Sequence, residues 1–99
     1  MRAARTDSNH AAITRILRQC GCVVQSLAAV GKGVPDLLVW IPRHKRLLLI
    51  EVKDGTKPPS ERRLTEEQVQ WHGEWRGAPV YIVSDVGQVL ELVGAKESA

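Results

Sequence analysis

The sequence predicts an α/β domain in which helices flank a mixed four-stranded sheet, with the element order αβββαβα. Three observations support this fold class. Apolar residues recur at the spacing of an amphipathic helix near both ends of the chain and again after residue 64. Four short segments are rich in β-branched or aliphatic residues. Turns and loops that contain glycine or proline separate most of these segments.

The first helix is expected over residues 9–20, because N-cap residues precede it and apolar side chains then recur on one face. Residues 22–27 are rich in valine and should form the first strand. The segment 28–34 contains two glycines and is expected to be a loop.

A β-hairpin is expected next, with strands over residues 36–41 and 46–53 and a turn at 42–45. The centre of the second of these strands, residues 47–50, is aliphatic without alternation. Such a run is expected of a strand that is covered on both faces in the middle of a sheet.

The second half of the chain opens with an irregular loop, residues 54–63, which is rich in proline. Thr65 and Gln68 have the identity and spacing of a capping box, so a helix should begin there. A fourth strand is expected over residues 79–83, and Asp85 can cap a last short helix. The helix between the third and fourth strands predicts a right-handed crossover.

The length of 99 residues suits one domain, which we expect to span residues 1–99. No apolar run approaches the roughly 20 residues that cross a bilayer, so no membrane partner is expected. The basic N-terminus leads into no apolar signal core, so we expect a cytoplasmic protein, in a bacterial cell or a phage-infected host. Cys20 and Cys22 provide two ligands where a structural zinc usually takes four, and we expect reduced thiols.

Fourteen basic residues outnumber 11 acidic ones, for a formal charge of +3, and their distribution is uneven. Before Asp36 the only acidic residue is Asp7, and further cations flank the hairpin turn and the proline-rich loop. A polyanion such as DNA is a natural partner for this surface, and a solvated basic face is the alternative. The candidate DNA-binding residues are Lys32, Lys57, Arg62 and Arg63.

The most informative residues are Asp36 and the pair Glu51 and Lys53. Side chains alternate across a strand, so Glu51 and Lys53 should share one face, about 6.6 Å apart at 3.3 Å per residue. Pairing about the predicted turn places Asp36 opposite Glu51. Two carboxylates and an ammonium group are therefore expected to converge at one edge of the sheet.

Two neighbouring carboxylates repel each other, and a divalent cation with hard oxygen ligands removes that penalty. Such a cation stabilises the charge that develops during phosphoryl transfer and lowers the pKa of a bound water. The main-chain carbonyl of Val52 is a candidate further ligand. Lys53 could orient the water, or accept its proton if the site lowers the pKa of Lys53 itself. The structural alternative is that Pro35-Asp36 is an ordinary turn and that Glu51 and Lys53 form a surface ion pair.

Three segments, residues 33–38, 49–55 and 64–72, resemble the VRR-NUC domain, a branch of the PD-(D/E)XK nucleases. The resemblance runs from the first helix to the last strand. It implies a restriction-endonuclease-like fold, dependence on Mg²⁺ or Mn²⁺, and structure-directed cleavage of DNA. It also implies catalytic roles for Asp36, Glu51 and Lys53, and a place near the site for Gln68. Stand-alone members resemble Holliday-junction resolvases, so branched DNA and a homodimer are expected.

The chain departs from this pattern in the first helix, where many relatives carry a metal-binding glutamate. His10 stands at the matching position and is a candidate metal ligand. The number of metal ions and the strength of cleavage are therefore left open.

Three tryptophans are candidates for packing: Trp71 and Trp75 lie four residues apart on one helix, and Trp40 lies on a strand. Core or dimer packing is the main interpretation of the helical pair, and base stacking is the alternative. The competing functions are a nucleic-acid-binding module of the same fold with little cleavage, and an accessory subunit of a restriction or repair complex. Clustered carboxylates favour the endonuclease, because binding alone does not require them.

Overall fold

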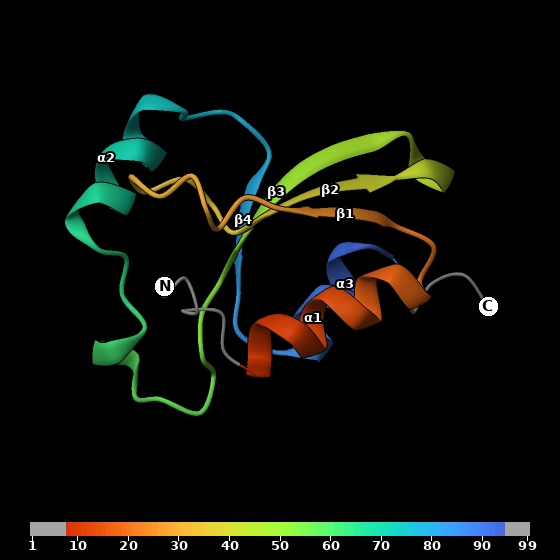
Figure 1. Ribbon diagram of the computed structural model, residues 1–99, viewed down its shortest axis with the longest axis horizontal. Coiled ribbons are helices and arrows are strands. Elements are labelled where there is room, and N and C mark those ends of the chain that lie inside the picture. The colour runs from red at the N-terminus through yellow and green to blue at the C-terminus, as the bar shows by residue number, and fades with distance from the viewer. Residues whose placement is uncertain (1–7, 95–99) are drawn as a thin grey trace.

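The computed structural model describes residues 8–94, and its elements follow the predicted order αβββαβα. A mixed four-stranded sheet has two helices on one face, and the remaining α-helix lies beyond one end of it (Figure 1). The helices and strands are α1 (Ser8–Gln19), β1 (Val23–Ser26), β2 (Leu37–Ile41), β3 (Arg46–Val52), α2 (Glu66–Glu74), β4 (Val80–Val83) and α3 (Val86–Leu92). No helix in this part of the chain is long and apolar enough to cross a membrane.

The strands lie side by side in the order β1-β2-β3-β4. β2 pairs antiparallel with β1 and β3, whereas β4 pairs parallel with β3, as the crossover through α2 requires. The hairpin register is the predicted one, with Leu37 opposite Ile50 and Ile41 opposite Arg46. The same register continued by one residue brings Asp36 next to Glu51.

Local signals in the sequence explain where several elements begin and end. Thr65 caps α2 and forms the predicted capping box with Gln68, and the Asp85 side chain caps α3. The hairpin turn is a short 3₁₀ helix over Pro42–His44, closed by Lys45 in the left-handed conformation.

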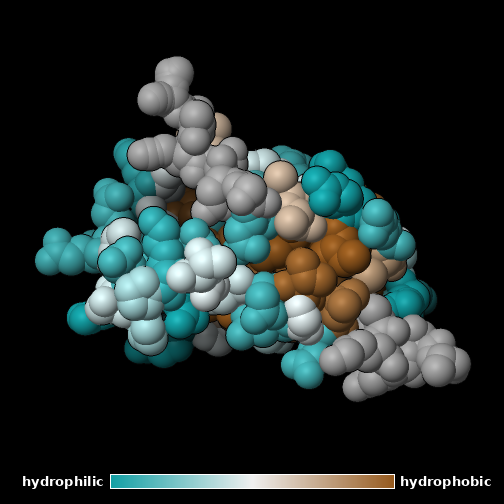
Figure 2. All heavy atoms as spheres, turned by 90° about the horizontal axis from the view of Figure 1, so that it is seen from below, coloured by the Kyte–Doolittle hydropathy of each residue, from teal (hydrophilic) through white to brown (hydrophobic). Residues whose placement is uncertain are grey.

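The core lies on one face of the sheet, which α1 and α3 cover together (Figure 1). Seen from the side of these helices, apolar residues gather in one part of the surface and polar residues dominate the rest (Figure 2). The buried residues are Ile13, Leu17, Cys22, Val24, Leu37, Val39, Ile41, Leu48, Ile50, Val83, Val89 and Val93. Cys20 and Cys22 are free thiols, as expected, and burial raises the pKa of Cys22.

The expectation that β3 is covered on both faces is wrong. Leu48 and Ile50 are buried on the helical side, but Leu47 points to the other side and is 54% exposed. It forms a row across three strands with Trp40 and Val23, which are 38% and 61% exposed. We call this row of three residues the open sheet face. It is open because α2 is short and is held at the far end of the sheet (Figure 1).

The loop before β2 packs closely against α2. Gly33 has a positive φ of 82°, and a Cβ atom at this position would collide with the carbonyl group of Glu67. Glycine therefore lets the loop lie against the first turns of α2, so that β2 begins beside the end of β3.

Candidate active site

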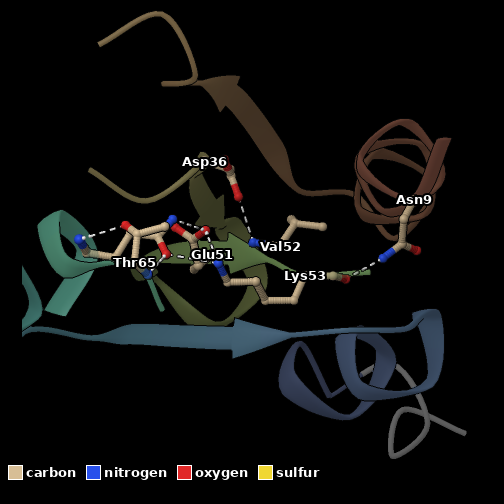
Figure 3. Close-up of polar contacts among 7 residues, drawn as sticks. Asn9, Asp36, Glu51, Val52, Lys53 and Thr65 are labelled. Carbon is tan, nitrogen blue, oxygen red and sulfur yellow. Dashed lines mark hydrogen bonds and ion pairs between the residues drawn. The ribbon is translucent and has the colours of Figure 1, made fainter. Parts of the chain in front are cut away.

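Asp36 is held at the end of the sheet by main-chain contacts on both sides. Its Oδ2 atom accepts a hydrogen bond of 2.7 Å from the Val52 amide, and its carbonyl oxygen accepts one of 2.7 Å from the amide of Leu27. The carboxylate thus lies across from the last residues of β3 (Figure 3).

Glu51 is almost completely buried, with 2% of its surface exposed. Its Oε2 atom accepts a hydrogen bond of 2.8 Å from the Gln68 amide nitrogen and lies 3.6 Å from the Lys53 ammonium group. Its Oε1 atom is shielded from solvent and has no hydrogen-bond partner among the residues that the structure describes. An unsatisfied buried carboxylate oxygen is costly unless a ligand or water meets it.

The electrostatics of the pair are unfavourable for two negative charges. Burial and the neighbouring Asp36 carboxylate together raise the pKa of Glu51 to about 7, although the Lys53 ammonium group lowers it in part. Near neutral pH Glu51 therefore still holds a proton in part of the molecules. A divalent cation would replace that proton and satisfy the buried oxygen.

Gln68 connects the two functional residues of β3. Its Oε1 atom accepts hydrogen bonds of 2.8 Å from Lys53 Nζ and 2.9 Å from the Thr65 amide, while its Nε2 atom donates to Glu51. An ammonium group needs an acceptor and a carboxylate needs a donor, so these neighbours fix the orientation of the amide. The same side chain thus closes the capping box of α2 and positions Lys53 beside Glu51.

Asn9, which directly precedes the candidate metal ligand His10, is a further residue of the site. Its Nδ2 atom donates to the carbonyl oxygens of Lys53 at 2.6 Å and Ser84 at 3.1 Å. It fastens the first turn of α1 to the residues that follow β3 and β4, and its contact with Lys53 is drawn in Figure 3. A polar residue near the start of a predicted helix was the only signal, and it did not indicate this long-range contact.

The predicted metal-ligand set is only partly brought together. Asp36, Glu51 and the main chain of Val52 converge, but His10 lines a groove between α1 and β1 instead. Within residues 8–94 no three His, Cys, Asp or Glu side chains form a metal-binding group. The structure therefore gives no support for His10 as a ligand beside the two carboxylates.

The predicted DNA-binding residues lie on two segments near the site. Lys32 borders a small hollow beside Glu67 and Trp71 of α2. The other three belong to the loop between Lys53 and Thr65, where the guanidinium of Arg62 donates to the Lys57 carbonyl oxygen at 2.7 Å. Lys57 and Arg63 are exposed.

A mixed sheet with paired carboxylates and a lysine at its end is the arrangement of a nuclease-type domain. The VRR-NUC domain model matches residues 2–82, and the chain belongs to the VRR-NUC family. Its four-stranded sheet and flanking helices agree with a restriction-endonuclease-like fold. A solved structure described as a VRR-NUC domain is 31% identical to this chain, with a TM-score of 0.60. The match covers 83% of this chain and 86% of that one. No curated protein gives a significant match.

The raised pKa of Glu51 predicts how stability depends on pH without metal. The folded state keeps the Glu51 proton up to about pH 7, whereas the unfolded state releases it near 4.5. The free energy of unfolding of the wild type should therefore fall, relative to Glu51→Gln, as pH rises through this window. The relative loss should be roughly 3 kcal/mol at about 1.4 kcal/mol per pKa unit.

Urea unfolding in EDTA at several pH values from 4 to 8.5 measures this difference. Glu61→Gln removes an exposed carboxylate outside the site and should keep the pH dependence of the wild type. Parallel curves for the wild type and Glu51→Gln would show that Glu51 titrates normally.

Proposed function

We propose that this protein is a metal-dependent DNA endonuclease that hydrolyses phosphodiester bonds at the site of Asp36, Glu51 and Lys53. One observation carries the proposal. Glu51 is a buried carboxylate with an unsatisfied oxygen and a raised pKa, placed beside Asp36 and within 3.6 Å of a lysine. A structural ion pair needs neither the burial, nor the unsatisfied oxygen, nor the raised pKa of Glu51. A cation-binding hydrolytic centre uses all three.

The donor set fits a hard divalent cation. Asp36, Glu51 and the Val52 carbonyl offer only oxygen atoms, which Mg²⁺ and Mn²⁺ prefer. When bound, the cation would stabilise negative charge on the phosphate and lower the pKa of a water molecule. Because the protein provides only a few ligands, coordination positions remain for substrate phosphate and water, as is usual for Mg²⁺.

Lys53 is the candidate for handling the proton of the attacking water. Its ammonium group is held by Gln68 and is largely shielded, with 14% of the side chain exposed. From this position the ammonium group can donate a hydrogen bond to the water and orient it, while Gln68 and Asn9 keep its side chain and backbone in place. Only the neutral amine, after loss of its own proton, could receive a proton from the water. Gln68 acts as a positioning residue, because it contacts Lys53 and Glu51 through hydrogen bonds of 2.8 Å.

A second candidate function is a DNA-binding or accessory module with weak cleavage. The observation that favours it is the lack of a third acidic or histidine ligand beside Asp36 and Glu51 in the described part of the chain. The two functions differ in one respect: only an endonuclease yields cut product when metal is added.

The proposed substrate is branched DNA, bound by two copies of the chain. The open sheet face supports a homodimer, since Val23, Trp40 and Leu47 expose apolar surface on adjacent strands. Trp71 and Trp75 stack on each other, with ring centroids 5.0 Å apart, and Trp75 remains 52% exposed. Two copies would bring two sites to one junction and double the phosphate contacts.

Cleavage assays test the enzymatic proposal. Labelled four-way junction, flap and duplex DNA are incubated with the protein and Mg²⁺, Mn²⁺ or EDTA, and we expect cutting only with metal and preferentially of branched DNA. Lys53→Ala should lower kcat by about a hundredfold or more, the usual contribution of a proton-transfer group, while DNA affinity is retained.

Asp36→Asn should abolish cutting at the same metal concentration, and Glu61→Gln serves as the control with an unchanged site. Undiminished cutting by Lys53→Ala, or cutting in EDTA, would contradict the assigned chemistry. Metal-independent binding without any product would favour the accessory module.

Sedimentation at micromolar concentration tests the proposed dimer. The wild type should sediment as a dimer, and Leu47→Lys should shift it to a monomer, because a charge would enter the interface while the exposed position leaves the fold intact. Val30→Lys changes an equally exposed loop residue, 55% accessible, and should leave the dimer unchanged. Monomeric wild-type protein, with and without junction DNA, would contradict the model.

A further inference from the structure

A groove between α1 and β1 has no part in the site described above. Its volume is about 750 Å³, and its walls include His10, Thr14, Arg15 and Arg18 from α1 and Ser26 from β1. The four helical residues lie on one side of α1. His10, Thr14 and Arg18 are four residues apart, and Arg15 lies three residues before Arg18. They extend from residue 10 to residue 18, which is a rise of about 12 Å at 1.5 Å per residue.

One end of this groove lies at the candidate active site. Ser26 pairs with Leu37, which directly follows Asp36, and Leu27 donates its amide hydrogen to the Asp36 carbonyl oxygen. On the opposite wall, His10 follows Asn9, whose side chain binds the Lys53 carbonyl oxygen. Both walls are therefore tied by hydrogen bonds to residues of the site, and the groove leads away from it toward the Arg18 end of α1.

The charge of the groove has one sign. The sequence contains no aspartate or glutamate from residue 8 to residue 35, while Arg15 and Arg18 are both exposed on the groove wall. Arg15 makes no hydrogen bond or ion pair with the described residues. Arg18 donates one hydrogen bond of 3.1 Å to the Val24 carbonyl oxygen, which leaves its other N–H groups available.

The groove also contains a hydroxyl group without a partner. Thr14 Oγ1 is shielded from solvent and makes no hydrogen bond within the described residues, although it lies between the arginines and the site end of α1. Its burial keeps this hydroxyl away from a ligand in the groove, whereas the two exposed guanidinium groups on the concave surface are suited to phosphate oxygens, which accept forked hydrogen bonds from arginine.

We propose that the α1–β1 groove binds the phosphodiester backbone of the strand that is cut, over the nucleotides on one side of the scissile phosphate. This proposal rests on the proposed nuclease function. The length of about 12 Å corresponds to roughly three nucleotides of one strand at 3.4 Å of rise each along the duplex axis. Arg15 and Arg18 contact these phosphates, and the strand enters the site past His10 and Asp36.

The salt dependence of DNA binding tests this subsite without any cleavage. The affinity of labelled duplex or junction DNA is measured in EDTA over about 50 to 200 mM NaCl for the wild type, Arg15→Ala, Arg15→Lys and Arg76→Ala. Arg15→Ala should weaken binding several-fold and reduce the slope of log K against log salt by about 1. Arg15→Lys should restore most of the slope, because the charge remains.

Arg76→Ala removes the same charge from an exposed residue beyond α2 and should leave the slope of the wild type. Equal DNA affinity and equal salt slope for Arg15→Ala and Arg76→Ala would contradict DNA binding in the groove, even if the wild type cuts DNA. If the slope of log K against log salt is smaller for Arg15→Ala and the wild type never cuts DNA, the groove binds DNA but the proposed endonuclease activity is wrong.

Substrate truncation locates the subsite relative to the cut. Oligonucleotides are shortened from one side or the other, and the penalty of Arg15→Ala is measured on each. The loss of affinity caused by Arg15→Ala should disappear for truncation on one side of the cut and persist for truncation on the other. On the first side the phosphates that Arg15 contacts have been removed. A penalty that persists after truncation on either side would show that Arg15 acts elsewhere.

Discussion

The burial of the Glu51 carboxylate beside Asp36 is the constraint on which the end of the sheet depends. Burial alone disfavours the charged form, and a second carboxylate adds repulsion. The surrounding groups offset only part of this cost. Gln68 donates one hydrogen bond and Lys53 contributes an ammonium group at 3.6 Å, but one oxygen remains unsatisfied. The fold thus keeps a buried carboxylate oxygen that a proton or the proposed cation would satisfy.

The asymmetry of the fold follows from the need to build this site. α1 and α3 bury one face of the sheet, whereas α2 is held at its end because Gln68 must reach Lys53 and Glu51. The remaining face keeps Leu47 and Trp40 exposed, which a second copy of the chain could cover. The position of α2 therefore connects the geometry of the site with the proposed assembly.

Much of the fold was predictable because its signals are local. The hairpin turn determined the register that brings Asp36 opposite Glu51, and the Thr65–Gln68 capping box located α2. The continuous aliphatic run of β3 was misleading, because a strand covered by helices and a strand with an exposed apolar face have the same composition.

The parts of the site that depend on the rotation of a helix were less predictable. Successive residues of a helix point about 100° apart, so neighbouring positions on α1 can reach different surroundings. Asn9 reaches the Lys53 carbonyl, while His10 lines the groove. A motif match identifies the helix but does not determine which of its residues faces the carboxylates. Only one group of the Gln68 hydrogen bonds could be anticipated from local sequence, namely the capping-box contact with Thr65. Its contacts with Glu51 and Lys53 depend on how α2 lies against the end of β3.

Calorimetric titration with Mn²⁺ in buffers of different ionisation enthalpy tests the central claim that Glu51 exchanges a proton for a cation. Because the pKa of Glu51 is about 7, binding near pH 6 should release close to one proton, and binding near pH 8.5 should release almost none. Glu51→Gln should bind Mn²⁺ more weakly and release no proton at either pH. Mn²⁺ binding of equal strength and equal proton release in the wild type and in Glu51→Gln would contradict the account.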